Sequence, residues 1–165
     1  MIVHTGQTGV ERGAWHAART VGLPTLGVMP SDGRDELGRI PQDICADLVV
    51  GLERGHRAAV RSCVELATAV LVVVPVAAAP SRFTAMSVVI SAASRAGRSW
   101  FVADMVTDVD DIAEWVTKQP SDGALRLFVT GPRSTRWTSG EAVARRIVTG
   151  LAMALSVGQL NVARG

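Results

Sequence analysis

The chain has no tyrosine, a single lysine and few aromatic residues of any kind. Phe, Trp and Tyr together make up 4% of its 165 residues, whereas 48% of the residues are hydrophobic. Proteins that read single-stranded nucleic acids stack the bases on several aromatic side chains, so this chain is not expected to bind them. Its core must instead be built from Val, Ala, Leu and Ile, and the length suits one domain with such a core.

The chain also lacks a large excess of charge of either sign. The chain has 17 Lys and Arg residues against 15 Asp and Glu residues, a net charge of +2, and Lys118 is the only lysine. This balance is too even for a general binder of nucleic acids or membrane surfaces. The preference for Arg has two explanations that the sequence leaves open. Arg grips phosphates and carboxylates with paired hydrogen bonds, and GC-rich codon usage also replaces Lys with Arg.

Cysteines and long hydrophobic runs are scarce. Cys45 and Cys63 form no CxxC pair and are too few for a disulfide scaffold. We expect no signal peptide, because the N-terminus leads straight into the predicted strand over residues 2–4. The longest uncharged run, between Glu65 and Arg82, is too short for a bilayer, which needs about 20 residues. We therefore expect a reduced, cytoplasmic protein that does not enter membranes.

Short apolar runs alternate with segments of helical period along most of the chain. Because strands that alternate with helices pair in parallel, this predicts a three-layer α/β sandwich with a mostly parallel, five-stranded sheet. Residues 29–48 show no clear period and are expected to form a long loop. We expect a single domain over residues 1–155 and a tail over residues 156–165. The predicted strands are 2–4, 25–28, 69–74, 99–103 and 125–129, and the predicted helices are 10–21, 60–67, 83–93, 109–116 and 139–154.

In such a fold, ligands bind at the carboxyl ends of the strands, near the point where the strand order reverses. The first loop there runs from Thr5 to Gly13. Gly6 and Gly9 allow a tight turn, and the helix that follows presents free N–H groups to an anion. The spacing matches neither GxGxxG nor a Walker loop. An ordinary strand-to-helix turn is the alternative interpretation.

Two further loops leave strand ends with polar side chains. Ser81 and Thr84 lie where the third helix is expected to begin, and they suit either a ligand or a simple helix cap. Gly131 and Arg133 follow the fifth predicted strand, together with Arg136 and two hydroxyl residues. This third loop suits phosphate binding or a solvated turn.

Four strings in these regions carry a resemblance to a known family: His4–Arg12, Pro30–Arg34 followed by Arg39–Pro41, Ser81–Ser87 and Phe128–Arg133. Together they resemble the molybdenum cofactor carrier family. That family is a Rossmann-like group allied to the lysine-decarboxylase-like (SLOG) nucleotide-binding proteins. The resemblance covers about residues 2–155.

The resemblance implies a homo-oligomeric carrier, a dimer or tetramer, which binds the molybdenum cofactor without transforming it. A nucleotide is the other candidate for its phosphorylated ligand. No metal site is expected, because His16 and His56 have no partners at ligand spacing. Arg12 either reaches a phosphate or pairs with a carboxylate such as Glu11 or Asp32. The predicted ligand-binding residues are Gly6, Gln7, Thr8, Gly9, Arg12, Arg34, Ser81, Thr84, Asp104, Gly131 and Arg133.

Departures from the family pattern keep two alternatives open. Arg82 and Phe83 stand where the family has a Gly pair, and their bulk would suit an interaction protein with a closed pocket. A hydrolase of nucleotide derivatives would instead need a carboxylate in the cleft. Glu11, Asp32 and Asp104 are the available ones. The Pro-Gly-Gly-x-Gly-Thr run of the allied phosphoribohydrolases is absent.

Overall fold

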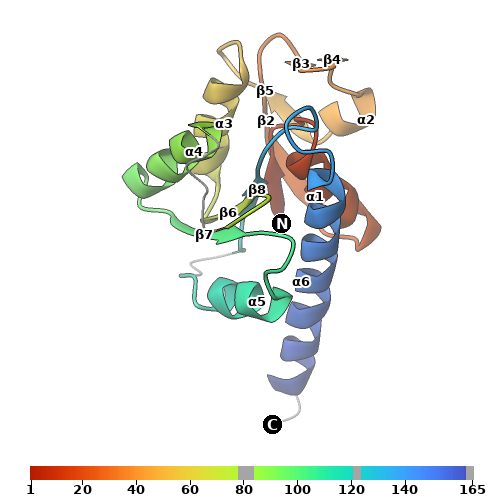
Figure 1. Cartoon of the computed structure of the whole chain (residues 1–165), viewed down its shortest axis with the longest axis vertical. Helices are drawn as coiled ribbons and strands as arrows, with labels where there is room; N and C mark the ends of the chain where they lie inside the picture. The colour runs from red at the N-terminus through yellow and green to blue at the C-terminus, as the bar shows by residue number, and fades with distance from the viewer. Residues whose placement is uncertain (78–83, 121–123, 163–165) are drawn as a thin grey trace.

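A parallel sheet forms the centre of the molecule (Figure 1). The computed structural model describes residues 1–77, 84–120 and 124–162. Within these ranges the main sheet has six strands, and every pair of neighbours runs in parallel. In spatial order the strands are β5 (Leu48–Val50), β2 (Thr25–Met29), β1 (Ile2–His4), β8 (Leu127–Thr130), β6 (Ala69–Val73) and β7 (Ser99–Ala103).

Helices cover both faces of this sheet and bury its alternating side chains. On one face, α1 (Val10–Thr20), α5 (Val109–Thr117) and α6 (Gly140–Val162) pack against Leu71 and Val73 of β6. On the other face, α3 (His56–Leu66) and α4 (Thr84–Arg95) pack against Val70 and Val72 of the same strand. All of β6 is buried, which explains its continuous apolar, Val-rich sequence. The predicted three-layer α/β sandwich is confirmed.

The sheet has one strand more than the five predicted. The stretch expected to be a loop contains a two-stranded hairpin, β3 (Arg34–Asp35) and β4 (Gly38–Arg39), the short helix α2 (Gln42–Cys45) and the beginning of β5. β5 is only three residues long, lies at the sheet edge and exposes two of its residues, so it shows none of the apolar period that predicts a buried strand.

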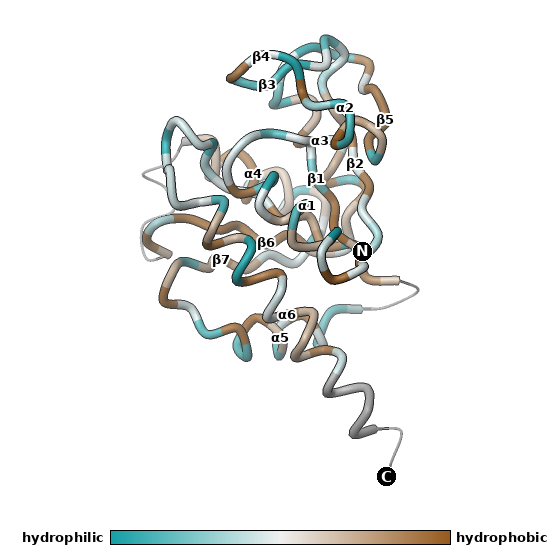
Figure 2. Tube along the Cα trace, turned by 90° about the vertical axis from the view of Figure 1, so that its right-hand side faces the viewer, coloured by the Kyte–Doolittle hydropathy of each residue, from teal (hydrophilic) through white to brown (hydrophobic). Residues whose placement is uncertain are grey.

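The molecule is elongated, with the β3–β4 hairpin at one end and α6 projecting at the other (Figures 1 and 2). α6 continues as one helix past residue 155, where we expected a tail to begin. It packs closely on α1: the two helices approach so closely that a Cβ on Gly13 would lie 2.2 Å from the carbonyl oxygen of Glu141. This contact requires glycine at position 13.

The strand order reverses between β1 and β6, with β8 between them. The chain leaves β1 through α1 on one face and leaves β6 toward α4 on the opposite face. The loops after these strands therefore separate to opposite faces and open a crevice at their carboxyl ends. The functional residues of the fold are expected there.

Candidate functional site

Two of the predicted loops lie side by side at this crevice. A Cβ on Gly9 would lie 2.6 Å from the carbonyl oxygen of Pro132 and 2.8 Å from the amide nitrogen of Ser134. The amide of Ser134 also donates to Oγ1 of Thr8 at 3.2 Å. The structure thus brings the loop after β1 and the loop after β8 into direct contact.

Glycine is required in both loops. Gly6 and Gly9 have φ values of 83° and 76°, which residues with a Cβ rarely adopt. Gly131 has no room for a side chain, since a Cβ there would lie 2.2 Å from the carbonyl oxygen of Val73. These three predicted residues shape the crevice through their backbone.

A buried carboxylate lies beneath the crevice. Glu11, in the first turn of α1, is 1% exposed. One of its oxygens accepts from the amide of Thr5 at 2.6 Å and from the Thr5 hydroxyl, and the other accepts from Oγ1 of Thr130 at 2.9 Å. Nε2 of His56 lies 3.9 Å from Glu11. Glu11 therefore ties together β1, β8 and the start of α3 and helps to orient His56.

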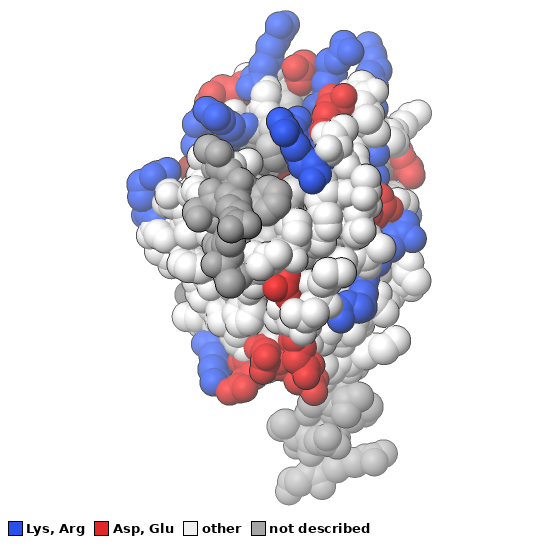
Figure 3. Space-filling view, viewed as in Figure 1, with Lys and Arg blue, Asp and Glu red and all other residues white. Residues whose placement is uncertain are grey.

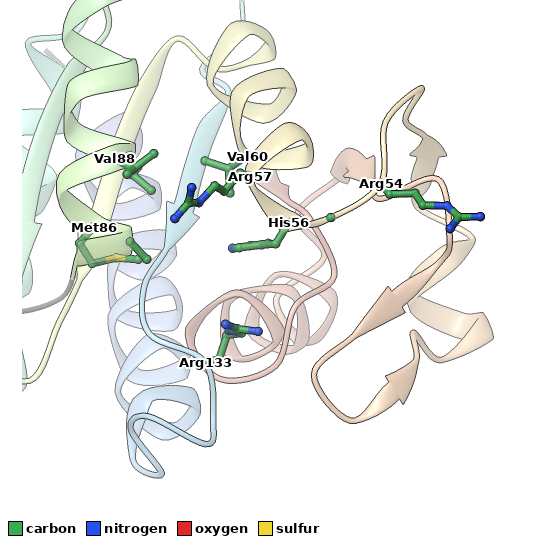
Figure 4. A pocket seen from close by; sticks show the side chains of 10 residues that line it. Arg54, His56, Arg57, Val60, Met86, Val88 and Arg133 are labelled. Carbon is green, nitrogen blue, oxygen red and sulfur yellow. The ribbon is translucent and has the colours of Figure 1, made fainter.

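A cavity of about 490 Å³ opens above this carboxylate, between the beginnings of α3 and α4. One side is lined by nitrogen-bearing side chains: Figure 4 shows His56, Arg57 and Arg133 pointing into the space, while Arg54 turns away. The other lining residues are small or apolar, namely Gly55, Val60, Ala85, Met86, Val88 and Val89. The cavity thus combines guanidinium groups with a hydrophobic wall.

The positive charge of this cavity comes from its arginines. Burial lowers the pKa of His56, although the Glu11 charge opposes this effect, so His56 is neutral at pH 7. Arg57 and Arg133 are exposed at the cavity mouth. On the face shown in Figure 3, basic side chains gather over the end that holds α3 and the hairpin, and a separate acidic patch lies toward the other end. The mouth is therefore suited to an anion.

Two predicted arginines lie away from this cavity. Arg12 forms an ion pair with Asp35 at 2.6 Å and donates to the carbonyl oxygen of Gly6 at 3.3 Å. Its partner is a carboxylate, as one interpretation expected, but Asp35 rather than Glu11 or Asp32. Arg34 is exposed in β3, and its carbonyl oxygen accepts from the side chain of Gln7 at 3.5 Å. Gln7 is itself 3% exposed.

Asp104 closes its own turn after β7. Its carboxylate accepts from the amides of Val106 and Thr107 at 3.0 Å and from the Thr107 hydroxyl at 2.9 Å. It also accepts from the amide of Ala77 at 2.9 Å. This last bond is the largest influence on the pKa of Asp104, which is lowered. Asp104 therefore joins the turn after β7 to the segment that leaves β6.

The second predicted loop is only partly described. Thr84 is the first residue of α4, whose next two residues line the cavity. Ser81, with Arg82 and Phe83, lies outside the described residues.

Sequence reasoning missed the contribution of α3. His56 and Arg57 follow β5, a strand that was not predicted and that begins at the last residue of the stretch expected to be a loop. A strand there would have placed His56 and Arg57 at a carboxyl end of the sheet. Met86 lies within the helix predicted over residues 83–93 but was not among the predicted ligand-binding residues.

Residues 1–77, 84–120 and 124–162 contain neither a membrane-spanning helix nor a cluster of metal ligands. No helix there is both long and apolar enough to cross a membrane. No group of three or more His, Cys, Asp or Glu side chains is arranged to hold a metal ion.

Comparison with known proteins adds to this description. The model of a family described as "Circularly permutated YpsA SLOG family" matches residues 2–152. A crystal structure named "Putative molybdenum carrier protein" from Syntrophus aciditrophicus SB matches with a TM-score of 0.77. It is 18% identical in sequence, and the match covers 90% of this chain and 92% of that one, so it shows a shared fold. The comparison with curated proteins gave no match.

Proposed function

The chain belongs to the circularly permutated YpsA SLOG family, and on this premise we propose that it is a carrier of a phosphorylated small molecule. The ligand lies in the cavity between α3 and α4 and leaves it chemically unchanged. The two candidates are a pterin resembling the molybdenum cofactor and a nucleotide, since both join a flat ring to a phosphate. The name of the Syntrophus protein, a molybdenum carrier, supports the first candidate.

One observation carries this proposal: the cavity combines Arg57 and Arg133 with a wall that contains Val60 and Met86. Guanidinium groups bind phosphate with paired, charge-assisted hydrogen bonds. A flat ring gains free energy by leaving water for an apolar wall. The volume of about 490 Å³ is within the usual range of small-molecule sites, roughly 300–1,000 Å³.

The positions of the carboxylates support binding without catalysis. A hydrolase of this fold would need a carboxylate free to take a proton at the reacting bond. Both oxygens of Glu11 already accept hydrogen bonds, and Asp104 is bound within its own turn and to Ala77. Asp32 is exposed in the segment before the hairpin.

Calorimetry with the molybdenum cofactor and with mononucleotides tests the proposal. Arg57→Ala removes a cation from the cavity mouth. Arg61→Ala is the matched control, because Arg61 lies one turn further along α3, pairs with Glu53 on the surface and does not line this cavity. We expect Arg57→Ala to weaken binding about tenfold, the effect of losing roughly 1.4 kcal/mol from a charge-assisted contact. We expect Arg61→Ala to leave the affinity unchanged.

Equal affinities for the two variants would contradict the location of the site. Binding by the unchanged protein should also weaken as salt is added, since the arginines are exposed to solvent. The recovered ligand should be intact. If the unchanged protein releases a hydrolysed product and Glu11→Gln does not, the hydrolase is favoured instead.

A further inference from the structure

A carboxylate of the chain itself lies at the junction of the two loops. Glu36, between the two strands of the hairpin, accepts from the hydroxyls of Thr8, Ser134 and Thr135 and from the amide of Thr135. The bond from the Ser134 hydroxyl is 3.0 Å and that from the Thr135 amide is 3.1 Å. Both of these bonds go to Oε1 of Glu36, and Nε of Arg133 lies 3.7 Å from Oε2. The Glu36 side chain is only 9% exposed.

The groups around Glu36 form a cradle for an oxyanion. The cradle consists of the Thr8, Ser134 and Thr135 hydroxyls, the Thr135 amide and the Arg133 guanidinium, and the hairpin contributes none of these donors. The Thr8 hydroxyl also accepts from the amide of Ser134, which leaves its own hydrogen directed at Glu36. Several hydroxyl and amide donors beside a guanidinium are the chemistry that binds phosphate or carboxylate oxygens.

The hairpin that holds Glu36 has few other attachments. Each of its strands has two residues, and a two-stranded hairpin is at best marginally stable alone. Besides Glu36, it is held by the ion pair of Arg12 with Asp35 and by the 3.5 Å contact of Gln7 with Arg34. Leu37, beside Glu36, is 68% exposed. The tip of the hairpin can therefore lift, whereas its base is held by Asp35, 1% exposed in its pair with Arg12, and by Ile40, 5% exposed directly after β4.

We propose that the cradle is a second anion subsite, that Glu36 occupies it in the absence of ligand, and that a phosphate group replaces Glu36 when the hairpin lifts. The subsite adjoins the cavity, because Arg133 lines the cavity and also contacts Glu36. This inference rests on the proposed function only in that the displacing group belongs to a phosphorylated ligand. Glu36 thus acts as a tethered competitor that lowers the affinity for phosphate.

The charge of Glu36 suits this role at every working pH. Burial acts to raise its pKa, but hydrogen bonds from Thr135, Thr8 and Ser134 outweigh burial and lower the pKa to about 2. Glu36 is therefore ionised near neutral pH, and another anion can replace it while keeping both the hydrogen bonds of the donors and the charge beside Arg133.

Titration with inorganic phosphate, followed by ³¹P NMR at low ionic strength, tests the proposal. Glu36→Ala empties the cradle. Asp32→Ala is the matched control, since it removes an exposed carboxylate four residues away and changes the net charge equally. We expect Glu36→Ala to bind phosphate at least tenfold more tightly than the unchanged protein, and Asp32→Ala to bind as the unchanged protein does. Adding Thr135→Val to Glu36→Ala should reverse much of the gain.

Equal phosphate affinity in folded Glu36→Ala and Asp32→Ala would overturn the proposal, because Glu36 would then only fasten the hairpin. If Glu36→Ala does not fold, Glu36→Gln keeps the shape of the side chain and removes its charge. It should also bind phosphate more tightly than the unchanged protein, and an unchanged affinity would overturn the proposal as well.

The outcome is separable from that of the proposed function. A gain of phosphate affinity in Glu36→Ala, together with no effect of Arg57→Ala on nucleotide or cofactor binding, would reject the cavity but keep the subsite. The reverse pattern would reject the subsite alone.

Discussion

Replacing Gly9 with alanine tests how closely the two loops of the crevice are packed. Gly9 has φ of 76° and ψ of −127°, a conformation that residues with a Cβ rarely adopt. The new methyl group would also meet the backbone of Pro132 and Ser134 at 2.6 and 2.8 Å. Backbone atoms cannot turn aside as a flexible side chain can. The substitution therefore strains its own residue and pushes the loops apart.

Gly55 offers a matched control for the strain alone. It also precedes a helix and has φ of 83° and ψ of 152°, but a Cβ there would have nothing within 4 Å. Backbone strain of this kind costs about 1–3 kcal/mol, and overpacking adds about 1–3 kcal/mol. We expect Gly55→Ala to lower the free energy of unfolding by about 1–3 kcal/mol and Gly9→Ala by about 2–6 kcal/mol.

Urea unfolding followed by circular dichroism measures both free energies. Both substitutions strain the backbone, but only Gly9→Ala also brings a methyl group against the loop after β8. Any further loss of unfolding free energy in Gly9→Ala therefore measures the packing of the two loops. An equal loss of stability in Gly9→Ala and Gly55→Ala would refute the close contact of the loop after β1 with the loop after β8.

Two further predictions concern buried titratable groups. Burial lowers the pKa of His4 to about 4, although the charge of Asp47 opposes this effect. The free energy of unfolding should keep its full value above pH 6.5 and fall by about 3 kcal/mol as the pH drops from 6.5 through 4, because only the unfolded chain protonates His4 in that range. NMR titration should show no protonation of His4 between pH 8 and 5.5, and a midpoint near 6.5 would contradict its burial. Burial also raises the pKa of the Cys63 thiol, whereas Cys45 is half-buried. A thiol reagent should label Cys45 first and Cys63 only as the protein unfolds, so rapid labelling of Cys45→Ala would refute the prediction.

Much of the fold could be predicted because its central strands, β1, β8 and β6, are buried on both faces. The run over Ala69–Val73 and the helical period of Val60, Cys63 and Val64 both reflect burial. The structure divides the strand between the cores on the two faces of the sheet and packs the helix against Val70 and Val72. The sequence of β5 shows no such burial pattern, since only Leu48 of its three residues is buried. The motifs around Gly6 and Gly131 carried the resemblance to the family, and the family match over residues 2–152 confirms it.

The candidate site was predictable only where it lies in loops next to long strands. Gly9 and Arg133 could be placed together because parallel strands end at the same edge of the sheet. His56 and Arg57 could not, since their position depends on the unrecognised β5. Glu36 gave no local signal at all: its partners lie 28 and 98 or more residues away in the chain, and only the folded hairpin brings them together.

Identification of the small molecules that the purified protein retains tests the central claim most directly. Native mass spectrometry, before and after denaturation, should reveal an anionic compound with a flat ring, either already bound or taken up from the molybdenum cofactor and mononucleotides. Arg57→Ala should retain less of it than Arg61→Ala. A neutral ligand, equal retention by the two variants, or no retention of any compound would contradict the account.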